Sequence, residues 1–175
     1  ISNNLGGITT NPQNGFQEGG SAIISQSLGA GLPKRALEAF RCILIINMAI
    51  GAVLMSLTLI FLGSISRLFS GGDPQFQQMI CSIYQMEALG SIPLGINAAV
   101  MALLYGFGKT RISLIINFSR VFIFRVPVLW GLQQFTDLGD ISAGIVMAVS
   151  NIATGVLAVI VGWITIRQIK KQYGI

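Results

Sequence analysis

The sequence predicts an all-α, polytopic transmembrane helix bundle with four long spans and one shorter N-terminal helix. Of the 175 residues, 53% are hydrophobic and only 10% are charged, whereas soluble domains carry about 25% charged residues. The apolar residues form long runs, and basic residues collect at the ends of these runs. This composition excludes a soluble monomer and a disordered chain. The absence of histidine excludes chemistry that depends on imidazole.

The N-terminal region differs from the rest in composition. Residues 1–13 are rich in Asn, Gly, Thr and Pro and predict a loop. Residues 15–30 predict a helix that is apolar only from Ala22 to Leu28, too short and too polar to cross a bilayer alone. Because the chain starts with Ile1 instead of Met, we expect an internal fragment of a longer protein.

Four longer segments follow, each containing about the 20 apolar residues that a helix needs to cross a hydrocarbon core. Residues 42–65 and 141–166 carry no charge, while 79–107 contains Glu87 as its only charge. The remaining segment, 112–135, contains Arg120, Arg125 and Pro127. The predicted helices cover residues 35–69, 75–107, 110–135 and 140–171.

The basic residues alternate along the chain as four spans require. Eight of them fall in the 31–41 and 108–111 connections and in the C-terminal segment, whereas the other two connections hold Arg67 and three aspartates. Because Lys and Arg concentrate in cytoplasmic loops, we expect a cytoplasmic C-terminus. The expected location is the cell (plasma or inner) membrane, and the basic residues do not form the patch that nucleic-acid binding needs.

Polar side chains within the spans are candidates for an ion or substrate pathway, because burying them in lipid is costly. Glu87, which shares a helix face with Tyr84, is either a cation-carrying carboxylate or a structural acid. Arg125 either binds substrate or satisfies the carbonyl that Pro127 leaves without a donor, and the second role is favoured. Asn97 and Asn151 are more often interhelical hydrogen-bonding residues than ligand contacts. Arg120 is expected to extend toward the cytoplasmic surface.

Small residues recur at helical spacing in two of the spans. Such stripes allow close helix packing in membranes, although random Gly and Ala enrichment is the alternative. One stripe contains Gly144, Ala148, Asn151, Gly155, Ala158 and Gly162, and the other contains Ala88, Ser91, Gly95, Ala98 and Ala102.

No motif for catalysis, for a cofactor or for a metal ion is present, so the sequence predicts a protein that is not an enzyme. Because a nucleotide-binding loop is also missing, any transport is expected to use an ion gradient or to be passive.

Several motifs, taken in order, resemble one family. Residues 26–31 (QSLGAG) followed by Lys34-Arg35-Ala36, residues 104–110 (LYGFGKT) and Arg125-Val126-Pro127 are similar to segments of the MATE (multidrug and toxin extrusion) transporters. The resemblance covers residues 14–170. It implies helices 8–12 of a twelve-helix fold, so that residues 14–175 form part of the C-terminal lobe.

The resemblance also implies a function. It implies export of organic cations or other amphipathic drugs in exchange for Na⁺ or H⁺, with no cofactor besides the coupling ion. The expected partners are the lipid bilayer, the missing N-terminal lobe and the small substrates. The sequence departs from the family at the ion site, because the position of the family's acid falls near Leu94, about two turns from Glu87.

Two other functions are compatible with the sequence. A lipid-linked polysaccharide flippase of the same superfamily would need several cationic residues in its cavity, and Arg120 and Arg125 are few for that task. A four-span scaffold protein without transport activity is the second alternative, against which the missing Met and the short first helix argue.

Overall fold

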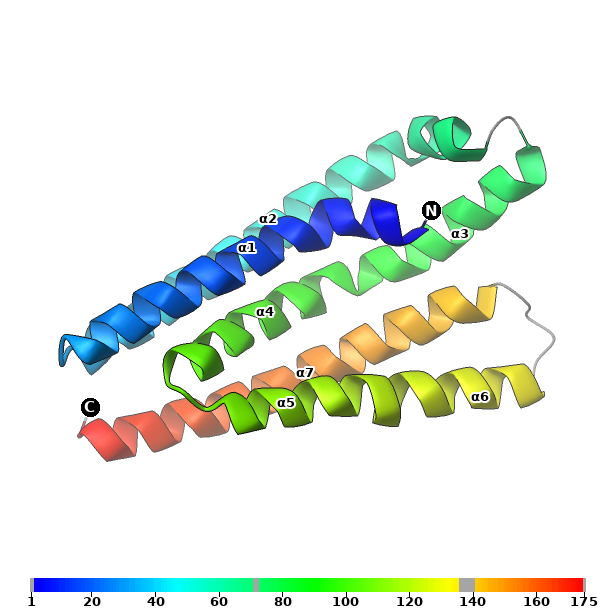
Figure 1. Cartoon of the computed structure of the whole chain (residues 1–175). Coiled ribbons are helices and arrows are strands. Elements are labelled where there is room, and N and C mark those ends of the chain that lie inside the picture. Colours follow the sequence, from blue (N-terminus) through cyan, green and yellow to red (C-terminus); the bar gives the residue numbers. More distant parts are fainter. Residues whose placement is uncertain (1, 71–72, 136–140, 175) are drawn as a thin grey trace.

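The computed structural model of the chain is an elongated helix bundle in which successive spans run in opposite directions (Figure 1). It describes the backbone of residues 2–70, 73–135 and 141–174. The side chains of residues 2–10, 68, 69, 76, 86, 87, 89, 132, 133, 135 and 141–143 lie outside the described part. The helices are α1 (Ser2–Gly29), α2 (Pro33–Ser70), α3 (Pro74–Leu89), α4 (Ser91–Gly106), α5 (Thr110–Phe118), η1 (Ser119–Arg125), α6 (Val126–Phe135) and α7 (Ile141–Tyr173).

The predicted fold class is confirmed, since every secondary-structure element in the described ranges is helical. Three helical segments in these ranges are long and apolar enough to cross a membrane: Pro33–Arg67, Thr110–Gly131 and Gly144–Tyr173. A shorter apolar helix, Ser91–Gly106, accompanies them.

The N-terminal helix is longer than the sequence predicts. The expectation of a loop over residues 1–13 was wrong, because α1 begins at Ser2 and has 28 residues, about 42 Å at the α-helical rise. Intrinsic preferences of Asn, Gly and Thr are weak, and tertiary packing often overrides them. Such packing is visible at Gln13, which is buried between helices and donates from Nε2 to the carbonyl oxygen of Ser91 at 3.3 Å.

The segment predicted as a single helix over residues 75–107 is broken in its middle. It forms α3 and α4, each of 16 residues, and Gly90 lies between them. Pro93 has no N–H with which to continue the hydrogen bonding of α3 to the carbonyl of Leu89. The new helix starts there instead, with the N–H of Leu94 donating to the carbonyl of Gly90 at 3.0 Å.

The next span is continuous but changes its helical type. Between α5 and α6, residues Ser119–Arg125 form the π-helix η1. The N–H of Val126 donates to the carbonyl of Val121, a bond across five residues. Pro127 follows directly, and a proline inside a helix removes one ordinary backbone bond, which accounts for a wider turn at this place.

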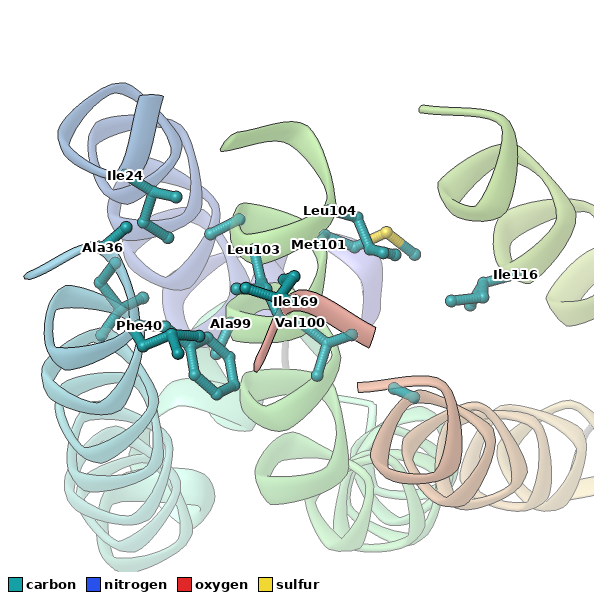
Figure 2. Packing of buried hydrophobic residues seen from close by; sticks show 14 residues of the cluster. Ile24, Ala36, Phe40, Ala99, Val100, Met101, Leu103, Leu104, Ile116 and Ile169 are labelled. Atoms are coloured by element: carbon teal, nitrogen blue, oxygen red, sulfur yellow. The ribbon is translucent and has the colours of Figure 1, made fainter. Parts of the chain in front are cut away.

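The core of the bundle surrounds α4. Its residues 97–104 are all buried, and α4 contacts α1, α2, α5 and α7. Figure 2 shows Leu103 and Val100 of this helix together with Ile24 of α1, Phe40 of α2 and Ile169 of α7. A helix that is apolar on all sides is typical of the centre of a bundle.

Three parts of the chain that carry basic residues lie at one end of the bundle. The α1–α2 turn, the α4–α5 turn and the C-terminus appear together in Figure 1. Two contacts tie the α4–α5 turn to the end of α7. The Nζ of Lys109 donates to Oε1 of Gln168 at 2.9 Å, and the rings of Phe107 and Tyr173 pack edge to face.

Candidate functional site

A polar contact links three helical segments at the break between α3 and α4. Arg120, on η1, donates from Nη2 to Oδ1 of Asn151 on α7 at 3.1 Å. Asn151 is buried and lies against Gly90, where an added Cβ would come within 2.7 Å of the Asn151 amide nitrogen. The absence of a side chain at Gly90 therefore allows Asn151 to lie against the broken helix.

Among the described residues, Arg120 has few hydrogen-bond partners. It is partly buried, and its Nε is enclosed without a partner. A guanidinium group has five N–H donors, of which the Asn151 contact uses one. The remaining N–H groups can donate to a further oxygen atom, including that of a negatively charged group.

A second arginine faces α7 from the same π-helix. Arg125 donates from Nε to Oγ of Ser150 at 3.4 Å, and that hydroxyl donates to the carbonyl of Met147 at 3.1 Å. A small cavity of about 200 Å³ adjoins Arg125 and is otherwise lined by Val126, Leu129, Val146 and Met147. Ser150 and Asn151, which are neighbours on α7, therefore each form a hydrogen bond with one arginine.

The expectation for Arg120 needs correction. Arg120 extends toward α7 instead of the membrane surface. Arg125 donates to a hydroxyl of the neighbouring helix, and the rings of Phe118 and Phe122 on the same span stack on each other at 4.3 Å between centroids.

The small residues of α7 lie against α3 and α4. An added Cβ at Gly155 would come within 2.6 Å of Pro93, and one at Gly162 within 3.0 Å of Val100. Gly90 lies against Asn151, Pro93 against Gly155 and Val100 against Gly162. The residue numbers rise together along the two helices, so α4 and α7 run in parallel. Asn97 is buried on the stripe between Pro93 and Val100, and its Oδ1 has no hydrogen-bond partner in the part of the chain that the structure describes.

The other predicted packing residues occupy varied positions. Gly144 is buried and Ala148 is partly buried on α7. Ala98 is buried in α4. Gly95 lies against α2, where an added Cβ would be 2.9 Å from the carbonyl oxygen of Asn47.

Of the predicted pair, Tyr84 and Glu87, the structure describes the side chain of Tyr84 only. Tyr84 is 1% exposed and packs with Leu62, Ile80 and Ala88, so its ring faces α2. Glu87 belongs to α3, one turn before Gly90, and its side chain lies outside the described residues.

Sequence reasoning missed Ser150 and the roles of Gln13 and Arg120. Ser150 is one position away from the predicted stripe, and nothing in its local sequence distinguishes it from an ordinary serine. The burial of Gln13 was not predicted, because residues 1–13 were expected to form a loop. Among the described residues, no cluster of acidic or Cys side chains could hold a metal ion.

Comparison with protein families identifies the fold. A family model described as MatE matches residues 1–130. The chain belongs to the MatE family. As a MatE protein with long apolar helices it is a multi-pass membrane protein, and its family supports the expectation that it is not an enzyme.

Solved structures share this fold at low sequence identity. One is the inward-facing conformation of a multidrug resistance MATE family transporter of the MOP superfamily, with a TM-score of 0.88 and 16% identity, covering 97% of this chain and 39% of that chain. Another is an outward-facing conformation described in the same words, with a TM-score of 0.83 and 17% identity, covering 91% and 36%. The chain thus spans less than two fifths of the matched transporters. No curated protein sequence matches it.

Proposed function

We propose that this chain is part of one lobe of a secondary active transporter that exports organic cations or other amphipathic drugs in exchange for Na⁺ or H⁺. The observation that carries the proposal is the helix break at Gly90. Gly90 lies against Asn151, which in turn accepts a hydrogen bond from Arg120. Discontinuous helices near the bilayer midplane form the ion and substrate sites of many secondary transporters. Each half of the broken helix is about 24 Å long, so the break lies near the middle of the span.

Glu87 is the proposed coupling acid. It precedes Gly90 by one turn on α3 and stands two residues before Leu89, whose carbonyl Pro93 cannot supply with a donor. A carboxylate and free carbonyl oxygens at the end of a half-helix suit a small cation or a proton. Protonation or cation binding at Glu87 would change the charge on α3 one turn before the Gly90–Asn151 contact, and this change supplies a means of coupling to the helix contacts.

The likeness to both transport conformations supports a rocking motion. The same chain fits an inward-facing and an outward-facing structure with TM-scores of 0.88 and 0.83. A lobe that moves as a unit would keep its own helix contacts in both states. The complementary wall of the cavity would come from the N-terminal lobe, which makes that lobe the principal partner.

The basic end of the bundle gives the proposed orientation. Lys34, Arg35, Lys109 and Arg111 lie in or beside turns at the same end as the C-terminus. By the positive-inside tendency, this end faces the cytoplasm, and the protein resides in the plasma or inner membrane.

The test is Glu87→Gln in the intact protein, measured as efflux of a fluorescent organic cation from proteoliposomes. Glu38→Gln is the matched control, since it removes an exposed carboxylate near the α1–α2 turn. We expect Glu87→Gln to abolish gradient-driven efflux and the control to retain it, with equal protein levels. Imposing a Na⁺ gradient or a pH gradient separately identifies the ion. Full efflux by Glu87→Gln would refute the coupling role.

A further inference from the structure

A long apolar groove runs between α1 and α2. It has a volume of about 560 Å³ and is lined by Pro12, Gly15, Phe16, Gly19, Gly20, Ile23, Ala39, Cys42, Ile43 and Ile46. None of these side chains carries a charge, and the volume lies within the range of small-molecule sites. The groove is therefore large enough for a ligand and suited only to an apolar one.

Two glycines leave open space along the groove. An added Cβ at Gly15 or Gly19 would have no atom within 4 Å, so the space beside these residues is open. At Gly20 the helices are in contact instead, because an added Cβ would meet Ile43 at 2.6 Å. The contact of Gly20 with Ile43 thus closes the bottom of the groove, and α1 and α2 form its two sides.

The length of the groove matches one leaflet of a bilayer. From Pro12 to Ile23 the α1 wall extends about 16 Å at the helical rise, and half of a hydrocarbon core is about 15 Å. The chain is a membrane protein, so the apolar molecule that this surface meets at the highest concentration is a lipid acyl chain.

The end of the groove nearest the α1–α2 turn is positively charged. Arg35 is exposed and lies one helical turn before Ala39, on the same stripe of α2 as the lining residues. Lys34 and Arg41 are exposed at the same end on the other side of α2, and Glu38 is the one acid there. Three cations and one carboxylate leave this end with a positive balance.

We propose that the α1–α2 groove binds one anionic glycerophospholipid, with an acyl chain along Gly15 and Gly19 and the phosphate near Arg35. Basic pockets between membrane helices are known to attract anionic head groups. The apolar lining alone would accept any lipid, and the charge at the end selects the anionic one. The site is separate from the contacts of Arg120 and does not depend on the proposed transport.

The test uses the intact protein in mixed micelles that contain equal amounts of phosphatidylglycerol and phosphatidylcholine with the same acyl chains. Native mass spectrometry counts the lipids that remain bound. We expect the unmodified protein to retain phosphatidylglycerol several times more than phosphatidylcholine. Arg35→Gln should lower this preference about fivefold, the effect of one basic side chain on binding of an anionic lipid, whereas Arg111→Gln, an exposed cation outside the groove, should not.

The acyl-chain part is tested by filling the groove. Gly19→Leu should place its side chain in the open space and abolish retention of both lipids. Gly63→Leu is the matched control, because Gly63 is exposed on α2 and an added Cβ there also meets no atom within 4 Å. Gly19→Ala serves as a milder variant if the leucine variant fails to fold.

Three results would overturn the proposal. The first is equal retention of both lipids by the unmodified protein, and the second is retention by Gly19→Leu equal to that of Gly63→Leu. If the unmodified protein retains no lipid while Gly19→Leu melts at a lower temperature than Gly63→Leu, another segment of the intact protein occupies the groove, which also overturns it.

Discussion

Substitution of Gly155 by alanine tests the packing of α7 on the broken helix. The new Cβ would lie 2.6 Å from Cβ and 3.0 Å from Cα of Pro93. Real Cβ atoms do not approach other atoms within 3.0 Å, and the ring and backbone of Pro93 cannot rotate away as a flexible side chain would. The two helices must separate, or α4 must shift, to admit one methyl group.

The expected magnitude comes from comparison with a glycine in open surroundings. Gly63→Ala meets no atom within 4 Å and should raise stability by about 0.5–1 kcal/mol through helix propensity alone. Gly155→Ala has the same gain but also an overpacking cost of about 1–3 kcal/mol. With about 2–4 °C per kcal/mol for a unit of about 150–250 residues, the difference between the variants is about 2–12 °C.

The assay is thermal unfolding of the purified protein in detergent, followed by tryptophan fluorescence. Gly155→Ala should melt below Gly63→Ala by the amount given. If Gly155→Ala melts at or above the control, the position does not lie against Pro93, and the interpretation of the α7 stripe as a packing face is refuted.

Two further predictions concern polar groups inside the bundle. A double-mutant cycle with Arg120→Met and Asn151→Leu should show a coupling free energy of about 1.5–3 kcal/mol, as expected for a hydrogen bond to a charged group. Additive effects of the two substitutions on the unfolding midpoint would mean that the two side chains do not interact. Asn47→Leu should stabilise the protein by about 1 kcal/mol or more, since Asn47 is fully buried and neither polar atom of its side chain has a hydrogen-bond partner among the described residues. A lower melting temperature for Asn47→Leu than for the unmodified protein would show instead that the amide has a partner.

Much of the fold could be predicted because bilayer crossing depends on local composition. The charge-free runs at 42–65 and 141–166 fall within α2 and α7, since a long apolar segment has no stable alternative to a helix in lipid. The alternation of basic ends also follows from composition. It correctly groups the α1–α2 turn, the α4–α5 turn and the C-terminus at one end of the bundle.

The candidate site was only partly predictable. Asn151 and Arg125 were identified as intramembrane polar residues, because such residues are rare and costly in lipid. Their partners were not identified, because the contacts form only when η1 packs on α7. Arg120 then contacts Asn151, and Arg125 contacts Ser150. The direction of the Arg120 side chain depends on which neighbour offers a hydrogen-bond acceptor, and a single sequence does not contain that information.

By itself, the sequence determined that the chain is helical, that it lies in a membrane and where its charged ends are. These properties depend on the hydropathy of individual segments, which the order of residues states directly. The tertiary structure alone decided the extension of α1 to Ser2, the break at Gly90 and the contact of Arg120 with Asn151. These features depend on close approach between helices distant in sequence, where the absence of one side chain, as at Gly90 or Gly155, determines which atoms can meet.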